Sequence, residues 1–171
     1  MKLSRHPHVE VDAPKAPPSV EEIAAIEAAA GARLPEALRS FLSEANGGKL
    51  DYLFDLRTEA GPFPLCFYSL YSTRLPYPGR AAAGLILHEL DLERRLKDLR
   101  PGLLPIAGDG GTSVLYVDLA PERSGRVVAY VEGLPGWDGT PEGSFVDLAP
   151  DLDAFLGALY LNTVDESKRG G

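Results

Sequence analysis

The chain is poor in the residues that most often signal chemistry or covalent cross-linking. Its 171 residues include one cysteine, three histidines, one methionine and one tryptophan. The single cysteine, Cys66, excludes an internal disulfide and agrees with a reducing compartment. No apolar run approaches the roughly 18 residues of a membrane-spanning helix, and the N-terminal residues include no apolar segment of the signal-peptide kind. We therefore expect a cytoplasmic protein without membrane contact.

The shortage of nucleophiles and bases argues against catalysis. Cys66 lies in an apolar run, where a buried and unreactive thiol is the expected state. A cysteine hydrolase also needs a neighbouring base. Two of the three histidines, His6 and His8, lie near the N-terminus, and His88 lies in a segment of ambiguous secondary structure. Because no Gly-x-Ser-x-Gly elbow is present either, we expect no catalytic residues and no enzymatic activity.

Metal and cofactor motifs are equally sparse. The run His6-Pro7-His8, with Glu10 and Asp12, has side chains that bind transition metals, but a solvated tail is the expected state. The turn Asp109-Gly110-Gly111 lacks the carboxylates that follow in a calcium loop. It also lacks the Gly-Lys-Ser/Thr of a phosphate-binding loop. We expect no metal and no cofactor.

Positive charge is in deficit as well. The chain has 25 acidic and 17 basic residues, for a net charge of −8. Such a surface repels nucleic-acid backbones and favours a basic partner, although acidity also keeps proteins soluble. A basic cluster interleaves with Asp91, Glu93 and Asp98, which predicts a salt-bridged helix face; it comprises Arg94, Arg95, Lys97 and Arg100. We expect a protein partner and no direct contact with nucleic acid.

The composition is that of one globular domain, with 44% hydrophobic and 25% charged residues. Residues 1–17 contain prolines and histidines without apolar periodicity, and residues 164–171 are polar and end in glycine. We expect both ends to be flexible. The predicted domain is residues 18–163. No feature of the sequence specifies an oligomeric state.

Two helices are predicted at the start of this domain. Ser19 and Glu22 form a capping box, and Gly31 ends the apolar stripe that follows. A second helix is expected after Leu34, with Pro35 at its first position and Asn46-Gly47-Gly48 at its close. Its apolar residues recur at helical spacing; they are Leu34, Leu38, Phe41, Leu42 and Ala45. The short connection predicts a helical hairpin.

The middle of the chain has the alternation and breakers of β-structure. Strands are predicted at 50–56 and 65–71, separated by a loop with Gly61, Pro62 and Pro64, and then at 103–107, 113–119, 126–132 and 144–148. Residues 81–90 fit either a helix or a strand, 91–99 predict a middle helix, and Pro150 opens a last one. We expect an α+β fold in which the hairpin, the middle helix and the C-terminal helix pack around a mostly antiparallel, twisted sheet.

The order of these elements resembles the SUKH superfamily, the fungal cell-wall-synthesis regulator and bacterial toxin-immunity domain. The resemblance covers residues 18–161 and rests on short apolar motifs in a defined order. These motifs are Leu34-Pro35, Phe41-Leu42, Asn46-Gly47-Gly48, Leu104-Pro105-Ile106-Ala107 with Asp109-Gly110-Gly111, residues 114–119, Val127-Val128 and Phe155-Leu156. A proline-rich stretch at 75–78 and the loop around Trp137 have no counterpart in the family pattern.

The resemblance implies a compact domain that acts by binding. Many bacterial members look like immunity proteins that neutralise a toxin, and eukaryotic relatives are regulatory interaction proteins. Our leading hypothesis is therefore a non-enzymatic bacterial immunity protein whose partner is a basic toxin domain. The alternatives are a regulatory or scaffold protein with an endogenous partner and a small hydrolase.

Aromatic residues in loops are the candidate partner-binding residues. Trp137 stands beside Asp138 in a glycine-rich loop, where an aromatic ring either covers the edge of the core or anchors a partner. Tyr71 and Tyr77 are further candidates. These four residues form the predicted binding set.

Overall fold

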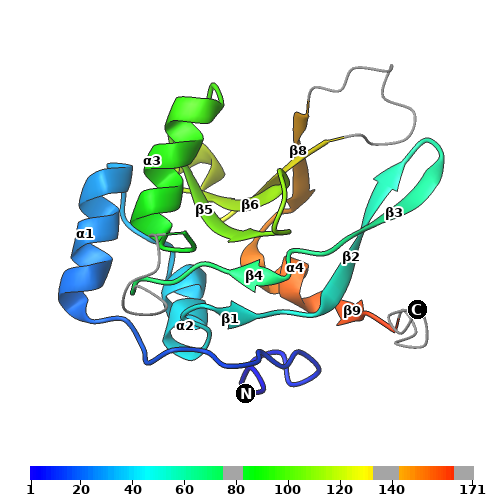
Figure 1. Cartoon of the computed structure of the whole chain (residues 1–171), viewed down its shortest axis with the longest axis horizontal. Coiled ribbons are helices and arrows are strands. Elements are labelled where there is room, and N and C mark those ends of the chain that lie inside the picture. The colour runs from blue at the N-terminus through cyan, green and yellow to red at the C-terminus, as the bar shows by residue number, and fades with distance from the viewer. Residues whose placement is uncertain (75–82, 133–142, 164–171) are drawn as a thin grey trace.

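A computed structural model describes residues 1–74, 83–132 and 143–163. Its main sheet has six antiparallel strands in the order β1-β4-β5-β6-β7-β8, and a second sheet has the order β3-β2-β9 (Figure 1). The main-sheet strands are β1 (Gly48–Lys49), β4 (Ser69–Leu70), β5 (Leu103–Gly108), β6 (Val114–Asp118), β7 (Val127–Val131) and β8 (Ser144–Ala149). The others are β2 (Tyr52–Thr58), β3 (Gly61–Leu65) and β9 (Tyr160–Leu161).

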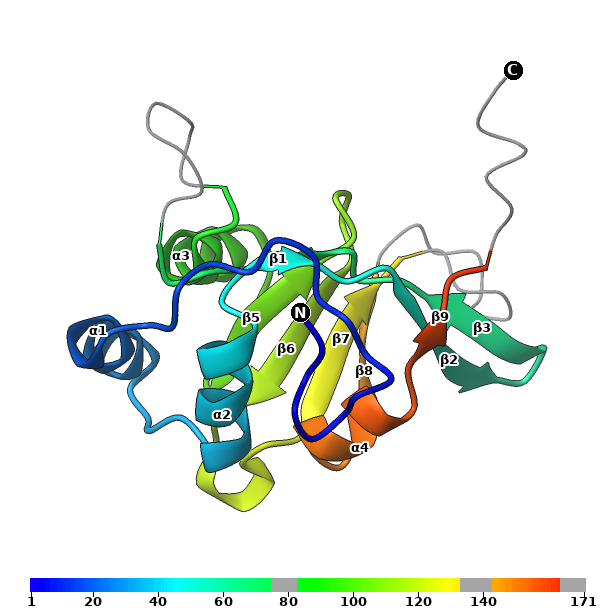
Figure 2. The same cartoon turned by 90° about the horizontal axis from the view of Figure 1, so that it is seen from below.

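Four α-helices and one short 3-10 helix complete the described chain. They are α1 (Val20–Ala30), α2 (Glu36–Glu44), α3 (Ile86–Leu96), α4 (Leu152–Gly157) and η1 (Pro121–Arg123). Figure 2 shows α2, α4 and the N-terminal segment on one face of the main sheet, and Figure 1 shows α3 on the other side. The predicted α+β class is confirmed.

The sheet carries apolar residues on both faces. One face joins the main core through alternate positions of its strands, among them Leu104, Ile106, Leu115 and Val117. The other face forms a smaller cluster of Leu103, Val114, Tyr116 and Val128. Because strand side chains alternate between faces, this double burial explains why β5 and β6 are apolar at nearly every position. The strand predictions there agree with the structure within one residue.

The capping residues of α1 behave as the sequence predicts. The Ser19 hydroxyl accepts a hydrogen bond from the Glu22 N–H, and a Glu22 carboxylate oxygen accepts one from the Ser19 N–H. Gly31 ends the helix with φ +70°. The second helix differs slightly, because Pro35 is the N-cap of α2 and not its first helical residue. The left-handed backbone after α2 lies at Gly47 and Gly48, not at Asn46.

The consecutive helices have different main neighbours. Helix α1 contacts α3, and α2 contacts α4.

Within residues 81–90, which fit either a helix or a strand by sequence, Ile86 to Leu90 are helical and belong to α3. Ile86 and Leu90 are buried. Helix α3 ends at Leu96, earlier than the predicted 99. The last helix begins at Leu152 and not at Pro150, since Asp151 is its N-cap and accepts from the Ala154 N–H at 2.7 Å.

The β2–β3 hairpin corrects the prediction for residues 61–71. The expected loop at 61–64 is strand β3, and of the expected strand at 65–71 only Ser69 and Leu70 form β4. Pro62 and Pro64 pair with Arg57 and Asp55. Strand β3 is the outer strand of its sheet. Pro62 and Pro64 lie two residues apart, so both positions that lack an N–H face the unpaired side of the strand. Prolines are tolerated at such an edge.

The N-terminal segment is the largest departure from the prediction. Residues 1–17 were expected to be a flexible tail, yet Leu3, Val9 and Val11 are buried in the main core. Asp12 and Lys49 exchange two backbone hydrogen bonds of 2.9 Å, which extends the sheet beyond β1. Three apolar side chains among prolines make no periodic pattern, so no local signal predicts this packing. Residues 164–171 lie outside the described residues.

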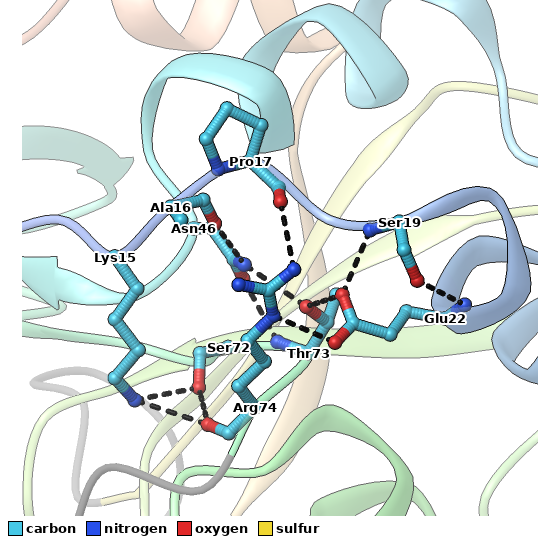
Figure 3. A network of polar contacts seen from close by, with 9 residues as sticks. All are labelled: Lys15, Ala16, Pro17, Ser19, Glu22, Asn46, Ser72, Thr73 and Arg74. Carbon is cyan, nitrogen blue, oxygen red and sulfur yellow. Dashed lines mark hydrogen bonds and ion pairs between the residues drawn. The ribbon is translucent and has the colours of Figure 1, made fainter.

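A polar network joins this segment to three other parts of the chain (Figure 3). Asn46 is fully buried; its Nδ2 donates to the Ala16 carbonyl at 2.8 Å and to Thr73 Oγ1 at 2.9 Å. The Thr73 N–H donates to Asn46 Oδ1 at 2.8 Å. Glu22 accepts from Thr73 Oγ1 at 3.0 Å and from Arg74 Nε at 2.7 Å. The network therefore links the N-terminal segment, α1, the α2–β1 turn and the chain after β4.

A second buried anchor lies at the end of β6. The Asp118 side chain is fully buried, and its Oδ2 accepts from Arg100 at 2.7 Å and from Arg123 at 2.9 Å. The Ala120 N–H donates to Oδ1 at 3.0 Å. Burial by itself would raise the pKa of Asp118, but the Ala120 N–H and the two guanidinium groups together lower it.

Removing the α1 cap should weaken the fold modestly. We expect Ser19→Ala to reduce the free energy of unfolding by about 1 kcal/mol, because the Glu22 N–H loses its acceptor. Urea denaturation of both proteins measures this difference. Ser43→Ala, which replaces an exposed helical serine, should cost less, and an equal loss would refute the capping role.

A side chain at Gly47, in the turn after α2, should destabilise the fold. At Gly47, φ is +75° and an added Cβ would lie 2.9 Å from the Ser72 Cβ. We expect Gly47→Val to lower the free energy of unfolding by roughly 2 kcal/mol or more, since strain and the close contact act together. Gly110→Val provides the control, because φ there is +83° but nothing lies within 4 Å. Thermal unfolding should show the smaller loss for Gly110→Val.

The paired Asp118 should make stability depend on acid pH. Its lowered pKa means that the folded state binds the proton less readily, so the stabilisation is complete above the unfolded pKa of about 3.9 and is lost as pH falls. We expect Asp118→Asn to cost on the order of 2 kcal/mol at neutral pH. The difference from wild type should shrink between roughly pH 5 and pH 2. A constant difference across urea denaturations at these pH values would contradict this assignment.

Candidate functional site

The predicted partner-binding residues fall mostly outside the described chain. Trp137, Asp138 and Tyr77 lie in 133–142 and 75–82, which are not among the described residues, as does the proline-rich stretch 75–78. Tyr71 is described, and it is half-buried directly after β4. An added Cβ at Gly108 would collide with the Tyr71 hydroxyl oxygen, so the tyrosine ring fits there only because residue 108 has no side chain. Burial, and then Glu89 and Glu93, raise the pKa of Tyr71.

Tyr71 lines a cleft of about 500 Å³ beside β1 and β4, which we call the Tyr71 cleft. Lys15, Lys49 and Glu89 also line it. Lys15 Nζ donates to Ser72 Oγ at 2.8 Å, and Glu89 Oε1 accepts from the Gly84 N–H at 2.7 Å. The charged groups of Lys15 and Glu89 are thus engaged within the chain, whereas Lys49 is exposed and its Nζ lies 5.8 Å from the centroid of the Tyr68 ring.

A larger hollow of about 800 Å³ lies at the other end of the molecule. Residues of β2, β3 and β8 line it, together with Ala158 and with Tyr160 of β9, and we call it the hairpin groove. Figure 1 shows the β2–β3 hairpin extending past the end of the main sheet, next to β8. Its lining comprises Phe54, Asp55, Leu56, Arg57, Thr58, Gly61, Pro62, Asp147, Leu148, Ala158 and Tyr160.

The hairpin groove combines carboxylates with exposed apolar surface. Tyr160 Oη donates to Asp55 Oδ1 at 2.5 Å, and this hydrogen bond raises the pKa of Tyr160. Asp147 pairs with Arg123 at 2.6 Å and with Arg126 at 3.5 Å, and Arg57 also lines the groove. Tyr160 is 42% exposed and its neighbour Leu161 is 61% exposed. Aromatic and arginine side chains are enriched in protein–protein interfaces, so this groove has the composition of a protein-recognition surface.

Sequence reasoning did not find the hairpin groove. No sequence motif distinguishes Asp55, Asp147 or Tyr160 from other residues of their kind. Tyr160 reaches Asp55 only because β9 pairs with β2. In this pairing Leu161 lies opposite Tyr52, and Tyr160 lies opposite Leu53. Two-residue strands carry no detectable alternation, so no local signal marks this contact.

The basic cluster begins on α3 with Arg94 and Arg95 and continues past its end with Lys97 and Arg100, and it has the predicted salt-bridged character. Arg95 pairs with Asp91 at 3.0 Å, Lys97 with Glu93 at 2.6 Å and Arg100 with Asp118 at 2.7 Å. The Lys97–Glu93 pair is largely buried rather than solvated, since the Tyr116 hydroxyl donates to Glu93 and Lys97 Nζ lies 4.2 Å from the Tyr130 ring centroid. These contacts hold α3 on the sheet.

The candidate nucleophile lies in an environment that disfavours its reactive form. Cys66 is half-buried, and burial, and then Asp51, raise the pKa of its thiol. Within residues 1–74, 83–132 and 143–163, Cys66 and His88 make no hydrogen bond to each other. His6 Nε2 lies 3.0 Å from Asp153 Oδ1, and His8 Nε2 lies 3.1 Å from the Leu156 carbonyl. These histidines attach the N-terminal segment to α4.

Two further observations concern metals and membranes. The described parts of the chain contain no group of three or more His, Cys, Asp and Glu side chains placed to hold a metal ion. Among the same residues, no helix has both the length and the apolar character of a membrane span.

Comparison with known proteins identifies the family of this chain. No curated protein matches the chain at a significant level. The model of the SMI1 / KNR4 family (SUKH-1) matches residues 17–158. That range begins just before the Ser19 cap, includes the main sheet and ends next to β9. Since the match covers most of the chain, this protein belongs to the SMI1 / KNR4 family (SUKH-1).

Proposed function

We propose that this protein is a non-enzymatic protein-binding module that serves as a bacterial immunity protein. It neutralises a toxin in the cytoplasm by covering the toxin's active site. The observation that carries this proposal is the hairpin groove, the larger of the two clefts described above, in a chain of the SUKH-1 family. SUKH domains typically act through protein partners.

Charge supports a basic partner. The chain has a net charge of −8. Complementary charges act mainly on the rate of association. A toxin directed at nucleic acid has a basic substrate groove, which a chain of this net charge complements. Trp137, Asp138 and Tyr77 remain proposed anchors outside the described residues, and Tyr71 is the fourth.

The chemistry of the described chain favours binding over turnover. Its one thiol has a raised pKa, and its histidines are spread over the N-terminal segment and α3. Nucleophilic catalysis requires a nucleophile within hydrogen-bond reach of a base. A regulatory or scaffold role with an endogenous partner would use the same groove and is distinguished by the identity of the partner.

The product of the gene adjacent to this one is the candidate toxin, and surface binding measures both rate constants. We expect binding at micromolar concentration or tighter, with an association rate that falls severalfold between low and near-physiological salt. Tyr160→Ala should raise the dissociation rate roughly tenfold, because a central aromatic anchor acts on the lifetime of a complex.

Leu96→Ala is the control, since Leu96 is 70% exposed on α3, at the far end of the molecule from the hairpin. It should leave both rates unchanged. Absence of binding at micromolar concentration, or an association rate indifferent to salt, would contradict the immunity proposal. Binding to an endogenous protein instead would favour the regulatory role.

A further inference from the structure

A further cleft of about 220 Å³ lies where three separate parts of the chain meet, and we call it the Cys66 cleft. These parts are the end of β3 with the residues that follow it, the β5–β6 turn and the end of β7. Most of its lining is apolar and comprises Phe63, Pro64, Leu65, Phe67 and Val131. All of these except Pro64 pack in or against the main core, so the walls of the cleft are held in place.

The charged lining of the Cys66 cleft is acidic only. Asp109 and Glu132 are exposed, and no lysine, arginine or histidine is among the described lining residues. Asp109 Oδ1 accepts from the Gly111 N–H at 2.7 Å, and Glu132 Oε2 accepts from Thr112 Oγ1 at 2.8 Å. Both donors are neutral. Within the described parts of the chain, neither carboxylate forms an ion pair.

The cation whose contacts reach this turn is engaged elsewhere. Lys97 Nζ donates to the Thr112 carbonyl at 3.4 Å, but it pairs with Glu93 at 2.6 Å and lies 4.2 Å from the Tyr130 ring centroid. Its charge is therefore held under α3, and the carboxylates of the Cys66 cleft have no cation of their own among the described residues.

The thiol at this cleft senses the same negative charge. Burial, and then Asp51, raise the pKa of Cys66, and Asp109 acts in the same direction. A nearby carboxylate disfavours a thiolate because like charges repel. The negative potential therefore extends from the rim of the cleft to the cysteine.

We propose that the Cys66 cleft binds an arginine side chain of the partner protein, with its guanidinium at Asp109 and Glu132 and its aliphatic stem along the apolar wall. This rests on the proposed function and names one contact that holds the partner. A guanidinium has five N–H donors and suits two carboxylates. Its methylene groups can be buried against Phe63 and Pro64 while the charged end stays at the rim. Arginine is also enriched among the residues that dominate binding energy.

Strand β3 connects the Cys66 cleft to the hairpin groove. Gly61 and Pro62 line the groove, and the next two residues, Phe63 and Pro64, line the cleft. A partner seated in the groove would therefore lie next to the cleft. The groove contains charges of both signs, whereas the cleft contains one sign only, and this difference assigns the arginine to the cleft.

Alkylation of Cys66 by iodoacetamide tests this assignment on the full chain. The chain has one thiol and the reagent is uncharged, so the rate reports access to the cleft. We expect N-acetyl-arginine amide at about 50 mM to slow alkylation at least twofold, since a single charge-assisted contact gives a millimolar dissociation constant. N-acetyl-citrulline amide, which has a similar shape and no charge, should leave the rate unchanged at the same ionic strength. Equal protection by both, or protection by neither, would overturn the inference.

Two matched double variants locate the effect. Asp109→Asn with Glu132→Gln removes both charges and keeps an acceptor oxygen for each hydrogen bond, and we expect it to lose the protection by arginine. Glu21→Gln with Glu36→Gln makes the same change of net charge on α1 and α2, which lie away from β3 (Figure 1), and should retain the protection. Near-UV circular dichroism checks that both variants are folded. Loss of protection in both would assign the effect to net charge and refute the cleft.

The two proposals fail in different experiments. Protection by arginine, together with an adjacent gene product that does not bind, would support the Cys66 cleft and refute immunity. A gene product that binds without slowing the alkylation of Cys66 would support immunity and refute the arginine contact. Both proposals predict a complex in which Cys66 is protected and in which replacing one arginine of the toxin by alanine restores the alkylation.

Discussion

The buried amide of Asn46 is the interaction on which the N-terminal half of this fold depends. It bonds to Ala16 and Thr73, segments 30 and 27 residues away, and Thr73 in turn donates to Glu22 (Figure 3). A buried amide without partners would cost the free energy of its lost hydration. The network is therefore stable only when all its segments are in place, which makes the packing of α1, the α2–β1 turn and the N-terminal segment one event.

The N-terminal segment has two roles that follow from this packing. Its apolar side chains Val9 and Val11 complete the core, and its backbone at Asp12 covers the edge of β1. The N-terminal segment therefore closes one edge of the main sheet, and Pro62 and Pro64 remove two N–H donors from the edge strand β3 of the second sheet.

The hairpin groove carries charged groups of both signs. Asp147 pairs with Arg123 and Arg126, and Asp55 and Arg57 also line the groove. The tyrosine hydrogen bond from Tyr160 holds Asp55 in position before binding, which lowers the entropy lost when a partner docks.

Local patterns in the sequence determined the elements whose signals are local. The Ser19–Glu22 cap, the Gly31 stop and the apolar strands β5 to β7 follow from contacts within a few residues and from burial on both faces, and the motif order identified the family. Only the tertiary structure decided the rest. The N-terminal segment packs through a few apolar residues that have no period, and Asp55 meets Tyr160 across 105 residues. Such contacts depend on how separate elements pack around one core, and a short stretch of sequence does not specify this packing.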